Sequence, residues 1–363
     1  MIDENFISLS FLGDISLNDD YNVLYKRGEK PFKQIGSILN KSDLVVGNLE
    51  CLAESKQGEN LLKKPRLKTK LETLNYLKDI NLGLACLANN HCYDNLEEGF
   101  NNTVSFLSEN GINYIGASVS GNENEPYIYK KNGIKIAILN YVTKDTNPNL
   151  PKDAKVNPNW FYLKKVEEDI AKLKNKVNYV IVYPHWGGKM EGAKLPDREL
   201  IPIAHKIIDA GADLIIGHHS HTLHPYEIYK GKYIFYSLGN FCFSDIQING
   251  KIIEFDKKRS SQSIIVNIKC NSRYLYVYYI IIHQKSHYLT TDNHKRLLND
   301  DRMRIFIPLL HINTLWFLYL FYEKQLYPII RYFFSNNRNP FKPLKTMNII
   351  NIKKRLKRLF INN

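Results

Sequence analysis

Cysteine is scarce in this sequence of 363 residues, and no two cysteines form a C-x-x-C pair. A disulfide framework or a thiolate zinc site needs closely paired cysteines, so neither is expected. The opening residues, MIDENFISLSFLGD, hold two acids near the start and no basic segment, which is not the pattern of a signal peptide. We therefore expect a cytoplasmic protein with reduced thiols. The five cysteines are Cys51, Cys86, Cys92, Cys242 and Cys270.

Acidic side chains are absent from residues 338–363, where eight lysines and arginines occur. The whole chain has a net charge of +14, so this short segment carries more than half of the excess. No recognised nucleic-acid-binding motif accompanies the basic residues. We expect no specific nucleic-acid partner.

A long apolar run is also missing, although a membrane-spanning helix needs about 20 predominantly apolar residues. The aromatic stretch at residues 305–322 is interrupted by Pro308, His311 and Asn313. Residues 351–360, NIKKRLKRLF, form a basic amphipathic segment. Two interpretations stay open: a helical cap packed on the main domain, or an interfacial anchor with aromatics in the headgroup layer and lysines on anionic lipid.

Short apolar runs alternate with amphipathic stretches up to about residue 283. Continuous β-branched runs are typical of buried strands in parallel or mixed sheets, and the stretches between them have helical spacing. The pattern predicts an α/β fold, with sheets flanked by helices over residues 5–283 and a helical, basic extension over residues 284–363. Asn132-Gly133 predicts a hairpin turn. The predicted strands are 7–14, 43–50, 82–91, 179–187 and 213–221, and the predicted helices are 69–80, 96–111 and 198–212.

Four histidines occur within residues 215–224, IIGHHSHTLH, although the chain has only 11. Neutral imidazole is a common metal ligand, and H-x-H spacing suits one ion or two neighbouring ions. The other predicted strands also end in polar donors. Ligands of open α/β sheets bind beyond the carboxyl ends of the strands, so we expect these donors to converge. They are Asp14, Asn48, Glu50, Asn89, Asn90, His91 and His185.

The donor set indicates the chemistry of the site. Carboxylate, amide and imidazole groups without thiolate suit divalent Mn, Fe, Zn or Mg. Six or more ligands exceed the need of one tetrahedral ion, so we expect two ions, which can activate hydroxide and hold the oxygens of a displacement at phosphorus. His91 follows two amides and is a candidate general acid or outer hydrogen-bond donor.

Six ordered motifs support a family resemblance: GD (13–14), GNLE (47–50), ANNH (88–91), HWG (185–187), GHHSH (217–221) and SLGNF (237–241). With them the sequence resembles the capsule-synthesis CapA (poly-gamma-glutamate biosynthesis) family over residues 6–245. That family is similar to calcineurin-like metallophosphoesterases, so the resemblance implies a metallophosphoesterase-like layered sandwich. It also implies a catalytic role for His91 and metal ligation by Asp14, Glu50, Asn90, His185, His219 and His221.

The sequence departs from the phosphoesterase pattern at two places. Asp14 is followed by Ile15 and Ser16, where a histidine two residues after the aspartate is usual. The segment that ends in Glu50 replaces a bridging second aspartate. These departures predict a first metal position that is weak, altered or empty, and the choice between His218 and His219 as ligand stays open.

Other polar residues are weaker candidates. Asp94 either orients His91 or caps the helix that begins near residue 96. The loop LLKKPRLK is either a solvated basic loop or a site for an anionic substrate, which Lys63, Lys64 and Arg66 could hold, with Lys64 and Arg66 as the expected contacts. Further candidates for the site are Asn48, His218 and Asn240.

The resemblance implies a metal-dependent, hydrolase-like protein of bacterial capsule or exopolymer biosynthesis. Its substrate would be a phosphoester or related bond of an anionic polymer, or a phosphorylated small molecule. The altered motifs keep an alternative open, a non-catalytic, metal-stabilised binding or assembly module for a membrane polymer synthase, so enzymatic activity is undecided. The basic C-terminal segment adds an expected contact with the inner face of the membrane.

Overall fold

The computed structural model describes residues 6–248, 250–292, 294–297 and 303–334. Contacts within the chain divide it into two units, Met1–Arg304 and Ile305–Asn363. The described residues 284–292 and 294–297 fall within the first of these units, and the domain boundary between residues 283 and 284 stays a prediction. The predicted basic segment at residues 351–360 lies outside the described residues.

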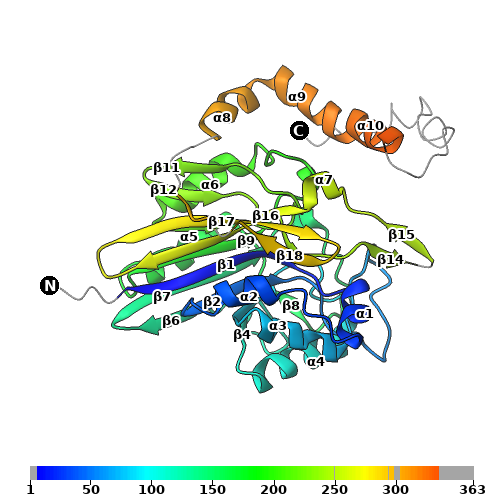
Figure 1. Cartoon of the computed structure of the whole chain (residues 1–363). Helices are drawn as coiled ribbons and strands as arrows, with labels where there is room; N and C mark the ends of the chain where they lie inside the picture. The colour runs from blue at the N-terminus through cyan, green and yellow to red at the C-terminus, as the bar shows by residue number, and fades with distance from the viewer. Residues whose placement is uncertain (1–5, 249, 293, 298–302, 335–363) are drawn as a thin grey trace. The chain divides into compact units, whose positions relative to one another are not determined.

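The first sheet contains the N-terminal strands and the late antiparallel strands of the first unit (Figure 1). Its order is β18-β17-β16-β1-β2-β3-β4, with β13 beside β1 and β19 beside β17. Strands β1 to β4 run parallel, whereas β16 is antiparallel to β1. The bounds are β1 Ile7–Ile15, β2 Leu44–Leu49, β3 Leu82–Cys86, β4 Asn113–Ile115, β13 Asn240–Cys242, β16 Gln262–Cys270, β17 Leu275–Lys285, β18 Tyr288–Thr291 and β19 Arg296–Leu297.

The second sheet has the order β11-β12-β10-β9-β7-β6. Its four central strands are parallel, and an antiparallel strand closes each edge. The β6–β7 hairpin turns at Asn132 and Gly133, both with positive φ, so the predicted turn is confirmed. The bounds are β6 Tyr127–Lys131, β7 Ile134–Val142, β9 Tyr179–His185, β10 Leu214–Ile216, β11 Tyr226–Tyr229 and β12 Lys232–Phe235.

Two cores explain why the strand sequences are apolar throughout. Along β1, Leu9 and Phe11 enter the core between the two sheets, whereas Leu12 and Ile15 face the core under the helices. Side chains alternate between the two faces of a strand, so a strand buried on both faces has no polar face. The predicted layered α/β sandwich is therefore confirmed.

Helices cover the outer faces of the sheets (Figure 1). Helices α2, α3 and α4 pack on strands of the first sheet, and α6 packs on β10 of the second. The predicted helix at 69–80 is instead a 3₁₀ turn, η1, followed by the short α3, and the predicted strand at 82–91 ends at Cys86. The bounds are α1 Asp20–Lys26, α2 Lys33–Leu39, η1 Leu71–Asn75, α3 Tyr76–Asp79, α4 Leu96–Glu109, α5 Leu163–Leu173 and α6 Leu200–Asp209.

The remaining small elements include two two-stranded sheets, β5–β8 and β14–β15. Their bounds are β5 Ala117–Ser118, β8 Asn157–Pro158, β14 Ile246–Ile248 and β15 Lys251–Ile253, and the short helical segments are η2 Lys144–Thr146, η3 Gly188–Met190 and α7 Lys257–Ser260.

The C-terminal described residues are helical, as predicted. Helix α8 (Met303–His311) is followed by α9 (Asn313–Phe321), the π-helical η4 (Tyr322–Leu326) and α10 (Tyr327–Phe334). Within the described residues, none of these helices alone has both the length and the apolar composition for a membrane crossing. The pair Met303–His311 and Asn313–Arg331 meets both criteria together, with a bend of 103° between its two parts.

Candidate metal centre

The site lies where the carboxyl ends of strands from both sheets meet. In the first sheet, Asp14 at the end of β1 is paired with Asn48 of β2 on one side and Asn240 of β13 on the other. In the second sheet, His185 at the end of β9 forms a bridge with His218, just beyond β10. The structure thus brings together strand ends that are far apart in the sequence.

Glu50 occupies the centre of this site. Its side chain is fully buried, and neither carboxylate oxygen has a hydrogen-bond partner among the described residues. Three imidazole Nε2 atoms surround Oε1, at distances of 3.7, 3.8 and 3.9 Å, which are too long for hydrogen bonds. A cation between these groups would satisfy the carboxylate and the imidazoles together, and an unpaired buried charge is otherwise costly. The three imidazoles belong to His91, His185 and His221.

Two groups of side chains are arranged to hold a metal ion. One consists of Glu50, His185 and His219, and the other of Asp14, Glu50 and His221. In each group the candidate ligand atoms lie within 4.8 Å of one another, and all of these residues are buried. Carboxylate and imidazole donors of this kind fit a divalent transition metal. Glu50 belongs to both groups.

The segment that supplies the histidines has a strained backbone. His219 and His221 have φ values of 95° and 57°, in a region that costs a residue with a β-carbon about 1–2 kcal/mol. Such strain persists where surrounding contacts impose it, and it is concentrated at functional sites. Here the His219 amide N–H donates to Asp14 Oδ2 at 3.3 Å, and His219 Nδ1 lies 3.1 Å from His185 Nε2.

Amide side chains hold the donors in place. Asn90 Oδ1 lies 2.9 Å from His185 Nε2, so Asn90 joins the other expected ligands. Asn48 Nδ2 donates to Asp14 Oδ1 at 2.7 Å and lies 3.2 Å from His185 Nδ1. Asn240 Oδ1 lies 2.9 Å from His221 Nδ1. All six residues expected to bind metal are therefore connected through close contacts.

His218 has different surroundings from the histidine that follows it. Its ring lies against Tyr183, with centroids 4.1 Å apart, and its Nδ1 is 3.4 Å from Asp14 Oδ1. Neither ring nitrogen makes a hydrogen bond with a described residue. Between the two candidates, it is His219 that belongs to a metal-holding group.

Asp94 contacts the imidazole of His91. Its Oδ2 lies 2.5 Å from His91 Nδ1 and accepts the Leu67 amide N–H at 2.7 Å. The alternative role as a cap does not apply, because the residue at the N-cap of α4 is Asn95, which makes no side-chain cap bond with a described residue. His91 Nε2 is thereby left facing Glu50.

A buried lysine completes this arrangement, in a role that the sequence does not predict. Lys63 is only 2% exposed, its Nζ lies 3.7 Å from Asp94 Oδ1, and it donates to the backbone carbonyl of Asn90. The neighbouring Lys64 is exposed, and Arg66 donates to Glu59 Oε2 at 2.7 Å. No signal in a stretch of adjacent basic residues distinguishes the buried lysine from the exposed one.

Burial and neighbouring charges shift the pKa values of the site. Burial, reinforced by the charge of Asp14, raises the pKa of Glu50 well above its ordinary value. Burial would also raise the pKa of Asp14, but contacts with His218, His221 and Asn48 outweigh it and hold this pKa low. Burial lowers the pKa of His219 to about 4, so its imidazole is neutral and able to bind metal at neutral pH.

A protein family matches the part of the chain that contains this site, and two relatives each match about two thirds of the chain. The bacterial capsule synthesis protein family PGA_cap matches residues 8–245. The capsule biosynthesis protein CapA of Bacillus anthracis is 30% identical over 252 residues, which cover 65% of this chain and 60% of that protein. The PGA biosynthesis protein CapA of Bacillus subtilis (strain 168) is 32% identical over 254 residues, covering 66% and 64%. The chain thus spans less than two thirds of the length of either relative.

Among solved structures, the NAD nucleotidase NadN of Haemophilus influenzae aligns with a TM-score of 0.46 at 15% identity. The alignment covers 88% of this chain and 60% of that chain.

Replacing Glu50 with glutamine is expected to stabilise the metal-stripped protein. Because the folded-state pKa of Glu50 is raised, the folded chain binds more protons than the unfolded chain, and stability falls as the pH rises above the ordinary glutamate pKa. Glutamine removes this penalty, so the free energy of unfolding should rise by about 1–3 kcal/mol near pH 8 and by less near pH 5. Urea unfolding in the presence of a chelator measures the difference.

The same variant should lose stability relative to wild type when Mn²⁺ or Zn²⁺ is added, because it lacks a charged ligand. Glu227→Gln is the matched control, since this buried glutamate already contacts His205 at 2.6 Å and Tyr236 at 2.5 Å and should only be destabilised by the change. A chelated Glu50→Gln protein less stable than wild type would contradict the assignment.

Proposed function

The chain belongs to the bacterial capsule synthesis protein family PGA_cap, and from this premise we propose that it is a metal-dependent hydrolase of capsule or exopolymer biosynthesis. Its substrate is a phosphoester, or a related acyl-phosphate or peptide-like bond, of an anionic polymer. A poly-gamma-glutamate-type chain, whose units are joined by amide bonds, is the candidate polymer. The observation that supports this most directly is the buried, unpartnered carboxylate of Glu50 among three imidazoles at the strand ends.

We propose that the site holds two divalent ions. Glu50, His185, His219 and Asn90 would hold one, and Asp14, Glu50 and His221 the other, with Glu50 shared. Divalent ions bound there would supply Lewis acidity and an activated water at neutral pH. The residues fit this function because every donor is an oxygen or an imidazole nitrogen held by the contacts described above.

We propose that His91 moves a proton in the reaction. Asp94 fixes its Nδ1, so Nε2 is the atom that holds or releases a proton toward the metal-holding groups. Lys63 lies on the other side of Asp94 and compensates the buried negative charge. We propose that Nε2 accepts the proton lost by the attacking water and gives it to the leaving oxygen or amide nitrogen, while the Asp94 contact keeps the ring in orientation.

Replacing His91 with glutamine should lower turnover of the metal-loaded protein by about 10²–10⁴-fold, the usual contribution of a positioned acid or base. The assay uses bis(p-nitrophenyl) phosphate, and metal content is measured on the same samples and should not change. His205→Gln is the control, because His205 pairs with Glu227 outside the site and its loss should leave turnover unchanged.

An unchanged rate in His91→Gln would remove the proposed role of this residue. If the metal-loaded wild type turns over neither this phosphodiester nor a gamma-glutamyl amide, the alternative is favoured, a metal-stabilised binding or assembly module for a membrane polymer synthase. The departure at Ile15 and Ser16 from the phosphoesterase pattern supports that alternative.

We also propose contact with the inner face of an anionic membrane through the C-terminal segment. Leu315, Leu318 and Tyr322 are exposed and follow one helical face of α9 and its continuation. The basic residues of 338–363 follow in the sequence and would attract anionic lipid by about 1 kcal/mol each.

The test is co-sedimentation with vesicles that contain phosphatidylserine. Neutralising the basic residues keeps the length of the chain and should abolish most of the binding, whereas vesicles of phosphatidylcholine alone should bind neither protein. Equal sedimentation of wild type and variant would refute the proposal. The variant replaces Lys353, Lys354, Arg355, Lys357 and Arg358 with glutamine.

A further inference from the structure

A pocket of about 490 Å³ lies beside the metal centre, on the side of His221. Asn240, which contacts His221 Nδ1, forms part of its wall. Phe243 and Phe255 form an apolar wall, with ring centroids 4.8 Å apart, and their centroids lie 4.9 and 5.2 Å from the imidazole of His221. The volume is typical of a pocket that binds a small molecule or one unit of a larger ligand. The pocket and the metal centre are therefore adjacent, with His221 between them.

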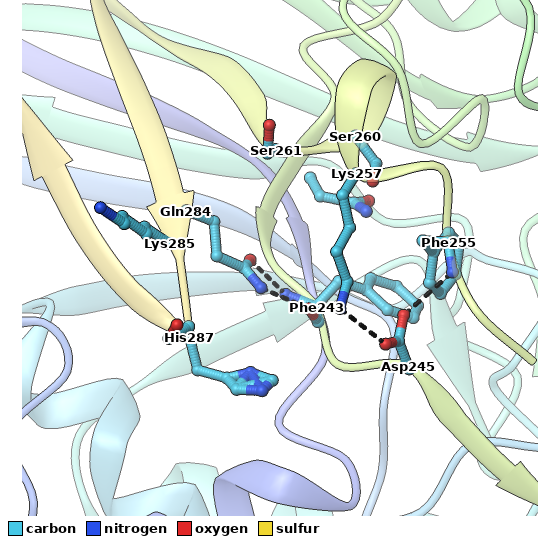
Figure 2. Close-up of a pocket in the computed structure, with 11 residues that line it drawn as sticks. Phe243, Asp245, Phe255, Lys257, Ser260, Ser261, Gln284, Lys285 and His287 are labelled. Carbon is cyan, nitrogen blue, oxygen red and sulfur yellow. Dashed lines mark hydrogen bonds and ion pairs between the residues drawn. The ribbon is translucent and has the colours of Figure 1, made fainter. Parts of the chain in front are cut away.

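The apolar wall is held rigidly. The side-chain amide of Gln284, on β17, accepts the Phe243 backbone N–H at 2.9 Å and donates to the Phe243 carbonyl at 2.6 Å (Figure 2). The oxygen and the nitrogen of this amide thus both hold the Phe243 backbone against a strand of the first sheet. A wall fixed before binding reduces the conformational entropy that a ligand would otherwise have to offset.

Two lysines line the pocket, and Lys257 is the one that lies beside the apolar wall (Figure 2). Lys257, at the start of α7, lies 3.3 Å from Asp245, and its side chain is 78% exposed. Asp245 is fixed in turn by accepting the Phe255 backbone N–H at 2.9 Å. Figure 2 shows Lys257 and Asp245 beside Phe243, whereas the side chain of Lys285 points away from Lys257. An exposed ion pair contributes little to stability, so an incoming anion can compete with Asp245 for the lysine.

These charges favour a singly charged anion. Burial lowers the pKa of His287, which also lines the pocket, so this imidazole is neutral at neutral pH. One lysine beside one aspartate matches a carboxylate next to an amide N–H, because the lysine takes the carboxylate and the aspartate can accept from the amide. A doubly charged phosphate would need a second cation beside Lys257 or a cluster of donors, and the side chain of Lys285 points away from Lys257 (Figure 2).

We propose that this pocket binds a carboxylate-bearing unit of an acidic polyamide chain, adjacent to the unit at the metal centre. Lys257 contacts the carboxylate, Asp245 accepts from the chain amide, and the phenyl rings of Phe243 and Phe255 contact the methylene carbons. This inference rests on the proposed function and adds to it the position of the polymer. The bound polymer would then follow one path across the site, from the pocket past Asn240 to the metal-holding groups.

The test measures binding of a short, fluorescein-labelled gamma-linked oligoglutamate by fluorescence anisotropy, with the full-length, metal-loaded protein. Lys257→Glu should weaken binding by at least about fivefold, because it replaces an attraction with a repulsion. Asp245→Asn keeps the Phe255 contact but replaces the acceptor for the polymer amide with an N–H donor, so it should bind the oligomer no more tightly than wild type. Tighter binding would show that Asp245 does not accept from the polymer. An alpha-linked oligoglutamate, run in parallel, distinguishes recognition of the linkage from recognition of carboxylates alone.

The matched control is an ion pair of similar exposure that does not line the pocket. Lys155 lies 3.4 Å from Glu97 and is 73% exposed, so Lys155→Glu and Glu97→Gln make the same changes of charge elsewhere. Both should leave affinity within about twofold of wild type. Thermal unfolding of every variant confirms that the fold is kept.

Each other outcome overturns the pocket proposal in a recognisable way. If wild type binds the oligomer and Lys257→Glu weakens binding no more than Lys155→Glu, the polymer binds elsewhere, and only the pocket assignment fails. If metal-loaded wild type binds neither oligomer, the acidic polyamide is wrong both as the ligand of the pocket and as the candidate substrate. The metal centre and the role of His91 are tested separately, by metal content and turnover.

Discussion

The uncompensated carboxylate of Glu50 is the constraint on which the rest of the site depends. It is fully buried, has no hydrogen-bond partner among the described residues, and faces three imidazole nitrogens at distances too long for hydrogen bonds. Burying a charge in this way opposes folding unless a cation is bound. The strained backbone at His219 and His221 adds to the cost, so the sequence here is better explained by function than by stability.

The two-sheet architecture explains how such a site is assembled. Asp14 and Asn48 come from the first sheet, and His185 comes from the second, yet the Asn48 amide lies between the other two. The apolar core between the sheets keeps their strand ends aligned. Beyond this edge, the buried Lys63 and Asp94 orient His91, and the pocket wall of Asn240 and Phe243 adjoins His221.

Much of this site could be predicted from sequence because its donors directly follow buried apolar runs. Each run predicts a strand, and parallel strands align their carboxyl ends, so Asp14, Glu50 and His185 were expected to converge. Contacts set by tertiary packing could not be predicted. The choice of Lys63 rather than Lys64 depends on a loop conformation, and the pocket joins Phe243 to Gln284, which are distant in sequence. The strand predicted to begin at Leu82 was also too long, because local spacing does not show where the chain leaves the sheet.

The most direct test of the metal centre is the metal content per chain, measured by inductively coupled plasma mass spectrometry. Wild type is compared with a His219→Ala/His221→Ala variant, each purified without chelator or affinity tag. The structure has two donor groups that share Glu50, so the account predicts two divalent ions in wild type and their loss in the variant. A wild-type protein without bound metal, or a variant that retains the full metal content, would contradict it.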